Sequence, residues 1–131
     1  MPELDCRFCH VADERIVQSN QVVLAVRDAY PVARGHTLII LRRHVVSFFD
    51  ATEEEARGLV ELLGAAKAAL DREVKPAGCT IGINDGGAAG RTVPHLHTHL
   101  IPRYLGDVAD PRGGVRWVLP EKAVYWTEDR E

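Results

Sequence analysis

Residues 93–103 carry three histidines that alternate with apolar or β-branched residues, in the order Val93-Pro94-His95-Leu96-His97-Thr98-His99-Leu100-Ile101-Pro102-Arg103. Alternation with a period of two is typical of a half-buried β-strand and predicts that His95, His97 and His99 share one face. Neighbouring side chains on one face of a strand lie about 6.5–7 Å apart, so a small charged ligand, or a metal together with a ligand, can span the row. A glycine-rich loop, residues 85–92, leads into it. We therefore expect the functional site here.

Composition and charge favour one globular domain and argue against two classes of partner. The chain has 131 residues, of which 46% are hydrophobic and 27% charged, so we expect a single domain over residues 1–131. A net charge of −3 gives no broad basic field, and we expect no nucleic-acid partner. No apolar run reaches the roughly 20 residues that span a bilayer, and residues 1–6 are acidic where a signal peptide is basic and then apolar. We therefore expect a cytoplasmic protein without a membrane partner.

The order of the predicted elements indicates an α+β fold. Short apolar runs predict strands over residues 15–17, 22–26, 36–41 and 78–84, in addition to the histidine strand. A helix begins near Thr52, because residues 52–55 fit a capping box, and it ends before Pro76. Its apolar positions recur at spacings of three and four, namely Ala56, Leu59, Val60, Leu63, Ala66 and Leu70. We predict a mainly antiparallel five-stranded sheet with one long helix on one face, and a homodimer that covers exposed parts of the sheet.

From the residues alone, three interpretations of the histidine row remain open. The row can be the polar, solvent-facing side of a strand. It can be a catalytic metal site, since alternate histidines chelate zinc, although the flanking residues supply no carboxylate base. It can also provide a nucleophile, because a neutral imidazole attacks phosphorus when a backbone carbonyl holds its other ring nitrogen as a donor. The phosphoryl oxygens then need donors, for which the sequence offers Asn84, Arg91, Thr92, His36 and His99.

Cys6 and Cys9 form a C-x-x-C pair near the N-terminus. In a reducing compartment such a pair is metal-binding or redox-active rather than a structural disulfide. Redox use requires the pair to open a helix after a strand, and no strand is predicted before Cys6. Zinc requires two further ligands, for which His10, His44 and His95 are candidates. Free thiols are the remaining alternative.

Three segments together resemble the histidine triad (HIT) family of nucleotide hydrolases and transferases. They are Gly35-His36-Thr37-Leu38-Ile39-Ile40, Asn84-Asp85-Gly86, and the run from Gly90 through Arg103. The alternating histidine signature is highly specific when a Gly-His pair and an Asn-led glycine loop precede it, and the resemblance extends from about Cys6 to Arg103. The sequence lacks both a G-x-x-x-x-G-K-[S/T] phosphate loop and a G-x-G-x-x-G motif that opens a helix, so nucleotide binding would use another route.

The resemblance implies that the middle histidine carries the reaction. His97 would be the nucleophile that takes up the nucleoside monophosphate, His99 would bind a phosphate oxygen, and His36 would support the triad. The ending Ile101-Pro102-Arg103 resembles the dinucleoside polyphosphate hydrolase branch more than the purine nucleoside phosphoramidase branch. The expected activity is cleavage of a dinucleoside polyphosphate, with an adenosine-type nucleotide as substrate, through a covalent nucleotidyl-histidine. Hydrolysis of adenosine phosphoramidate and non-catalytic nucleotide binding are the alternatives.

The same resemblance implies the substrate-binding residues. Asn84 and Thr92 would bind phosphate or the leaving group, and Asp28 would bind the ribose hydroxyls. Arg91 departs from the family, in which glutamine is common at this position; an arginine can bind phosphate in a bidentate manner or point to solvent. The base pocket would be lined by Phe8, Ile16, Leu24 and Val26.

For the cysteines, the resemblance to some HIT proteins and to galactose-1-phosphate uridylyltransferases implies a closed zinc site made by Cys6, Cys9, His44 and His95. A closed tetrahedral site is structural. It would fix an N-terminal knuckle, residues 1–14, to the end of the catalytic strand. Residues 104–131 would form a C-terminal tail that carries both tryptophans.

Overall fold

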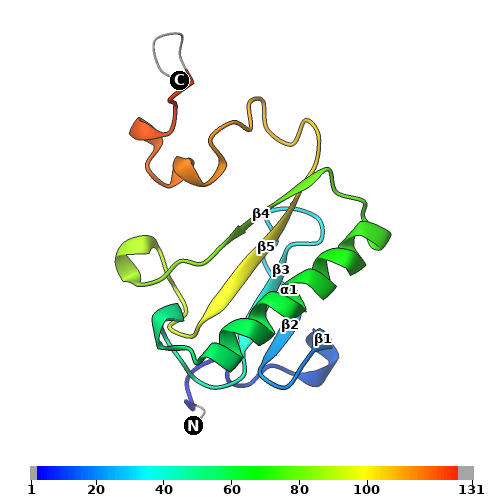
Figure 1. Ribbon diagram of the computed structural model, residues 1–131, viewed down its shortest axis with the longest axis vertical. Coiled ribbons are helices and arrows are strands. Elements are labelled where there is room, and N and C mark those ends of the chain that lie inside the picture. The colour runs from blue at the N-terminus through cyan, green and yellow to red at the C-terminus, as the bar shows by residue number, and fades with distance from the viewer. Residues whose placement is uncertain (1–2, 127–131) are drawn as a thin grey trace.

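The computed structural model describes residues 3–126, so residues 1–2 of the predicted knuckle and 127–131 of the predicted tail lie outside the described part. Within residues 3–126 the chain forms one α-helix, α1 (Glu53–Glu73), and the strands β1 (Ile16–Ser19), β2 (Val23–Arg27), β3 (Thr37–Leu41), β4 (Gly78–Gly82) and β5 (His97–Arg103). Short 3₁₀ turns cover Asp13–Arg15, Phe48–Asp50, Gly87–Ala89, Gly114–Val118 and Pro120–Lys122. The strands pair antiparallel in the order β1-β2-β3-β5-β4 (Figure 1). The predicted α+β fold is confirmed.

Helix α1 begins as predicted but buries a slightly different face. The Glu55 amide donates to Thr52 Oγ1 at 3.0 Å and the Thr52 amide donates to Glu55 Oε1 at 2.8 Å, which completes the capping box. Val60, one of the recurring apolar positions, is 66% exposed, whereas Leu62, which lies outside that pattern, is only 5% exposed. The helix is thus rotated about its axis relative to the prediction. Gly58 explains this rotation, because it lets the helix approach Val22 so closely that a Cβ at position 58 would overlap Val22 Cγ2. The helix therefore packs closest along the face that carries Glu55, Gly58, Leu59, Leu62, Ala66 and Leu70.

The two faces of the sheet have different roles. Helix α1 crosses one face (Figure 1), and the main apolar cluster between helix and sheet contains Val23, Ala25, Ile39, Leu41, Val45, Leu59, Leu62, Ala66, Leu70, Leu96 and Leu100. The other face carries a smaller apolar cluster of Leu24, Val26, Leu38 and Ile40. Across the β3–β5 pair, His99 lies opposite Leu38 and His97 lies opposite Ile40, and opposed residues share a face. Both histidines therefore lie on the face that the helix leaves open.

The histidine strand is shorter than predicted. β5 begins at His97, not at Val93, because the His95 amide donates to the Val93 carbonyl at 2.8 Å and closes a three-residue turn. This turn takes His95 out of the predicted row, and its side chain is fully buried. The His97 and His99 rings remain neighbours, with centroids 5.3 Å apart.

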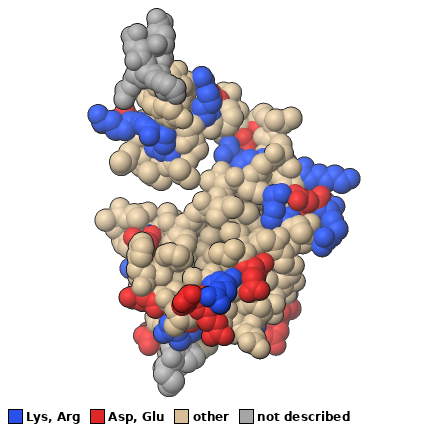
Figure 2. Space-filling view, in the orientation of Figure 1, with Lys and Arg blue, Asp and Glu red and all other residues tan. Residues whose placement is uncertain are grey.

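Residues 104–126 form a lobe beyond the end of β4 and β5 (Figures 1 and 2). The Trp117 indole donates to the Arg112 carbonyl at 2.9 Å, and the Arg112 guanidinium lies 4.8 Å from the Trp126 ring centroid. These contacts lie within the lobe itself. Acidic and basic side chains are interspersed on the face shown in Figure 2. Across residues 3–126, we find no helix with the length and apolar character needed to cross a membrane.

Candidate active site and metal centre

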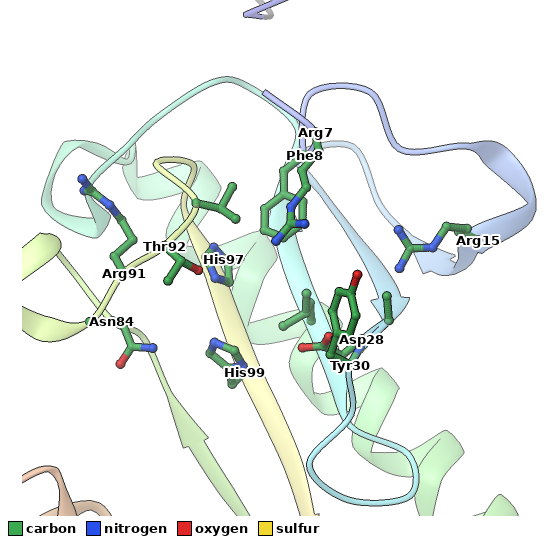
Figure 3. Close-up of a pocket in the computed structure, with 14 residues that line it drawn as sticks. Arg7, Phe8, Arg15, Asp28, Tyr30, Asn84, Arg91, Thr92, His97 and His99 are labelled. Atoms are coloured by element: carbon green, nitrogen blue, oxygen red, sulfur yellow. Dashed lines mark hydrogen bonds between the residues drawn. The ribbon is translucent and has the colours of Figure 1, made fainter. Parts of the chain in front are cut away.

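A pocket of about 210 Å³ opens on the helix-free face of the sheet, beside β5 (Figure 3). Three segments that are distant in sequence enclose it: the N-terminal knuckle, the loop after β2, and the glycine-rich loop before β5. Its lining consists of Arg7, Phe8, Arg15, Asp28, Ala29, Tyr30, Leu38, Asn84, Gly90, Arg91, Thr92, Val93, His97 and His99. The pocket thus combines two histidines with amide, hydroxyl and guanidinium donors and one carboxylate.

His97 presents one free nitrogen to this pocket. Its Nδ1 lies 2.7 Å from the His95 carbonyl oxygen, and because a carbonyl can only accept, Nδ1 carries the proton. Nε2 of the neutral ring therefore keeps its lone pair. Burial lowers the pKa of His97; the hydrogen bond to His95 and the charge of Asp28 oppose this effect, while the charges of Arg7 and Arg91 add to it. The ring is thus neutral at pH 7.

His99 is oriented by a chain of hydrogen bonds from the loop before β3. The Val32 amide donates to His36 Nδ1 at 3.2 Å, so His36 carries its proton on Nε2. That nitrogen lies 2.9 Å from His99 Nδ1, which must accept, and the remaining N–H of His99 is on Nε2. Burial lowers the pKa of both rings and keeps them neutral. His99 therefore offers a donor beside the free lone pair of His97.

His36 reaches its position through a turn at the preceding glycine. Gly35, directly before it, has φ +90, and a Cβ there would lie 2.8 Å from Leu70 Cδ2. This glycine lets the loop turn over the helix end and deliver His36 into the sheet. His36 is 3% exposed and does not line the pocket itself, but its Nε2 also lies 3.5 Å from Asp28 Oδ2. The structure thus places His36 behind His99.

The four expected substrate-binding residues outside the triad all line the pocket. Asp28 lies on the wall next to Tyr30, and Asn84, Arg91 and Thr92 lie on the opposite side (Figure 3). The Tyr30 amide donates to Asp28 Oδ1 at 2.8 Å, which fixes the loop after β2. In Figure 3 the Arg91 guanidinium extends away from the two histidines.

The expected base-lining residues separate into two groups. Phe8 lines the pocket, and its ring packs edge-on against His97 with centroids 4.9 Å apart. Leu24 and Val26 belong to the apolar cluster on this face of the sheet, and Ile16 packs against it. Leu38, which was not expected, contributes to the pocket from the same cluster.

Arg7, Arg15 and Tyr30 line the pocket but were not assigned from the sequence. Arg15 Nη2 donates to the Arg27 carbonyl at 3.0 Å, so this side chain is fixed against β2. For Arg7 a signal existed: it stands between the two cysteines of a knuckle predicted to lie against the catalytic strand. Arg15 and Tyr30 belong to no motif, and only the tertiary structure brings them to the site.

A second cluster brings together Cys6, Cys9, His44 and His95, the last of which precedes His97 by two residues. Their ligand atoms all lie within 4.8 Å of one another. His95 Nδ1 is 3.2 Å from Cys6 Sγ, 3.5 Å from Cys9 Sγ and 3.2 Å from His44 Nδ1, and His44 Nδ1 is 3.2 Å from Cys9 Sγ. Tetrahedral zinc, with bonds of about 2.3 Å to sulfur and 2.0–2.1 Å to nitrogen, separates sulfur from nitrogen by about 3.5 Å and two nitrogens by about 3.3 Å. The observed distances fit this geometry.

The tautomer of His95 supports the same assignment. His95 Nε2 lies 2.6 Å from the Leu41 carbonyl oxygen and must therefore donate to it. The lone pair is then on Nδ1, which faces the two thiols. A backbone carbonyl on the far nitrogen is a common outer partner of a metal-bound imidazole. These four residues can hold a metal ion, whereas His10 lies apart from them, with its Nε2 3.0 Å from the Glu3 carbonyl oxygen.

Comparison with known proteins agrees with this geometry. Residues 10–106 match the HIT domain family. Over 109 residues the chain is 36% identical to an uncharacterized 16.1 kDa HIT-like protein of Mycoplasma pneumoniae, covering 79% of this chain and 75% of that protein. It is 33% identical to a bis(5'-adenosyl)-triphosphatase of Saccharomyces cerevisiae, covering 74% of this chain and 48% of the yeast protein.

Two solved structures are similar to this chain in fold. A Zn-bound histidine triad family protein from Mycobacterium smegmatis superposes with a TM-score of 0.74 at 32% identity, covering 82% of this chain and 81% of the other. A HIT family protein from Bacillus subtilis superposes with a TM-score of 0.71 at 34% identity, covering 76% of this chain and 74% of the other. The chain belongs to the HIT family, whose members are in general nucleotide hydrolases or transferases.

Proposed function

We propose that this protein hydrolyses a dinucleoside polyphosphate and releases a nucleoside monophosphate through a covalent intermediate on His97. The observation that supports this most directly is the hydrogen bond of 2.7 Å from His97 Nδ1 to the His95 carbonyl, which leaves the Nε2 lone pair in the pocket. In the first step Nε2 bonds to the α-phosphorus while the bond from phosphorus to the bridging oxygen breaks, and the second nucleotide leaves with the electron pair. In the second step water bonds to the phosphorus and the nitrogen–phosphorus bond breaks.

The other polar residues of the pocket have roles that follow from their position. His99 would donate from Nε2 to a phosphoryl oxygen, and His36 would hold His99 in that tautomer. Asn84, Thr92 and Arg91 would bind the phosphates of the leaving nucleotide. Asp28, on the opposite wall, would bind the ribose hydroxyls.

Among similar proteins, the yeast bis(5'-adenosyl)-triphosphatase supports this choice of substrate class. Because the chain covers only 48% of that protein, the support comes only from the 99 residues that the two proteins share. The similarity does not by itself assign the activity of the whole yeast protein to this chain.

The test is a panel of diadenosine triphosphate, diadenosine tetraphosphate and adenosine phosphoramidate, each followed by release of AMP. We expect the highest kcat/KM on one of the two dinucleotides, and a burst of the leaving nucleotide in pre-steady-state measurements. Acid quenching during the burst should release AMP from the protein, whereas alkaline quenching should retain it, because a phosphorus–nitrogen bond to histidine is acid-labile. Absence of a burst together with inversion at phosphorus would contradict the covalent route.

Two other results would replace the proposal. Faster turnover of adenosine phosphoramidate than of either dinucleotide would assign the protein to phosphoramidate hydrolysis. Tight nucleotide binding without any turnover would identify a non-catalytic nucleotide-binding protein.

We also propose that the Cys6, Cys9, His44 and His95 site holds a structural zinc ion. Four protein ligands close the coordination sphere, so a metal bound there would stabilise the knuckle and would not activate water. The zinc-bound M. smegmatis structure is consistent with zinc in a protein of this fold. Metal analysis of the purified protein should give about one zinc per chain.

A homodimer remains part of the proposal. Two apolar residues are available for an interface: Val60 on α1 is 66% exposed, and Ile81 on the edge strand β4 is 49% exposed. Leu63, another of the apolar helix positions, is half-buried and packs against the main apolar cluster. Light scattering coupled to size-exclusion chromatography should give twice the chain mass of 14.5 kDa; a mass of one chain would reject the dimer.

A further inference from the structure

One short segment belongs to the metal centre and to the pocket at the same time. Cys6 and Cys9 face His95 and His44, while the two residues between the cysteines, Arg7 and Phe8, line the pocket. The Cys9 amide donates to the Cys6 carbonyl at 3.1 Å, so the four residues form one tight turn. The position of either side chain in the pocket thus depends on the position of the two thiols.

The knuckle has few other attachments. Within residues 3–126, every hydrogen bond from residues 3–10 to the rest of the chain joins a thiol to an imidazole. The remaining bonds of this segment, such as the His10 amide to the Arg7 carbonyl at 3.3 Å, are internal to it. Phe8 adds an apolar contact to the cluster on the open face of the sheet. A metal ion bound to both cysteines and both histidines would therefore be the principal link between the knuckle and the sheet.

Arg7 is the cationic side chain that the knuckle brings toward His97. Its guanidinium lies over the Phe8 ring, 5.5 Å from the centroid, and Phe8 itself packs against His97 (Figure 3). Among residues 3–126 the Arg7 side chain forms neither an ion pair nor a hydrogen bond, so its donors are available to a ligand. Arg15 differs, since it is bonded to a backbone carbonyl, and Arg91 extends away from the histidines.

We propose that Arg7 binds the phosphate group of the nucleotide at His97, and that metal binding by Cys6, Cys9, His44 and His95 holds Arg7 in the position to do so. A guanidinium donates two parallel hydrogen bonds to phosphate, and the aromatic face beneath it restricts its orientation. The metal would then contribute to substrate affinity through the knuckle without touching the substrate. This inference rests on the proposed nucleotide pocket, but it concerns binding and not turnover.

The first experiment compares AMP with adenosine by isothermal titration calorimetry on the zinc-loaded protein. We expect Arg7→Gln to weaken AMP binding about tenfold and adenosine binding less than twofold, since only AMP has a phosphate. The AMP affinity of Arg7→Lys should lie between those of the wild type and Arg7→Gln, because lysine keeps the positive charge but cannot donate two parallel hydrogen bonds as a guanidinium does. The matched control is Arg57→Gln on the exposed face of α1, where the side chain is 72% exposed and binding should not change.

The second experiment measures the link to the metal. By thermodynamic reciprocity, AMP must tighten zinc binding by the factor by which zinc tightens AMP binding. Zinc affinity is measured by competition with a chromogenic chelator, with saturating AMP, saturating adenosine or no ligand. We expect AMP to raise zinc affinity several-fold in the wild type and to have less than twofold effect in Arg7→Gln; adenosine should act weakly and equally in both.

The possible results separate this inference from the hydrolase proposal. Unchanged AMP affinity in Arg7→Gln, or equal losses for AMP and adenosine, would overturn the role of Arg7. Equal AMP–zinc coupling in wild type and Arg7→Gln would overturn the role of the metal in positioning it. If Arg7 shows the expected effects while no substrate is turned over, the hydrolase proposal alone fails. If wild-type protein binds no AMP, both are overturned.

Discussion

His95 and His97 are two residues apart, yet they present opposite ring nitrogens to opposite sites. His95 donates from Nε2 to the Leu41 carbonyl and faces the thiols with Nδ1. His97 donates from Nδ1 to the His95 carbonyl and faces the pocket with Nε2. In both cases a backbone carbonyl determines which nitrogen keeps its lone pair. The identity of the residue thus gives the chemistry available, and the backbone around it decides where that chemistry is directed.

The two sites also differ in access to solvent. The His95 side chain is fully buried, and its cluster offers four ligands that close around one point. His97 is partly exposed in a pocket with room for a ligand. Four ligands that close around one point suit a structural metal, whereas a solvent-accessible imidazole with a free lone pair can reach a substrate. We therefore expect substitutions in the metal cluster and substitutions in the pocket to have different consequences.

The largest effect is expected for His97→Gln. Turnover should fall by about 10⁴-fold or more, because glutamine cannot form the covalent intermediate. Zinc content and melting temperature should stay close to those of the wild type, since this ring contributes no metal ligand. Steady-state kinetics, metal analysis and thermal denaturation on the same preparation test this together. Loss of zinc in His97→Gln would show that the two sites are not distinct.

Cys6→Ser should mainly change zinc content and stability, which His97→Gln leaves unchanged. The variant loses one of four ligands, so we expect it to retain little zinc and to lose about 4 kcal/mol of stability, as is typical when a structural metal is removed. Cys79→Ser is the matched control, because that thiol is partly buried against the main cluster and far in sequence from the knuckle. Denaturant unfolding measures both. A Cys6→Ser protein with full stability and full zinc would eliminate the proposed metal site.

The sequence predicted the parts of this arrangement that depend on local pattern. The capping box at Thr52 and Glu55 placed the start of α1 within one residue, because it requires only two side chains at a fixed spacing. The strand predicted over residues 36–41 was also found, as Thr37–Leu41, because the segment is too short for a typical helix and is rich in β-branched residues.

What the sequence did not predict depends on tertiary contacts. The rotation of α1 that buries Leu62 and exposes Val60 follows from the close approach of Val22 to Gly58, which no helical pattern contains. Alternation alone predicted a continuous strand, but the chain turns at Val93 and the buried His95 ring donates to the Leu41 carbonyl, which is distant in sequence. Arg7 reached the pocket through the folding of the knuckle. Each difference arises where distant segments meet.

His36→Ala should reduce turnover by an intermediate factor, about 10–100-fold. This substitution removes the donor that fixes the tautomer of His99, so His99 loses its orientation while the nucleophile stays in place. His36→Asn, which can still donate to His99, should recover part of the activity. Zinc content should be unaffected in both variants. Equal loss of activity in His36→Ala and His97→Gln would mean that His36 takes part in the covalent chemistry.

The smallest effect is expected at the ion pair between Arg43 and Glu55, next to His44 of the proposed metal site. Arg43, which precedes His44, donates from Nη2 to Glu55 Oε1 at 2.8 Å and from Nε to Oε2 at 2.8 Å. This pair holds the segment that carries His44 against the start of α1. Glu55→Gln keeps the capping hydrogen bond and removes the charge, so we expect a loss of about 1 kcal/mol with turnover unchanged, because Arg43 is partly exposed.

The pH dependence identifies the source of that loss. The hydrogen bond from Arg43 lowers the pKa of Glu55 from its ordinary value of 4.5. A depressed carboxyl pKa contributes stability that is fully present above about pH 4.5 and is lost as pH falls through the lower, folded-state pKa. The stability difference between wild type and Glu55→Gln, measured by denaturant unfolding, should therefore be constant above pH 5 and shrink below pH 4. Glu53→Gln, in the same helical turn with its side chain 86% exposed, is the control and should show a smaller difference at every pH. A difference that persists unchanged at low pH would assign the loss to packing rather than to the ion pair, and the His44 segment would then be held without the help of charge.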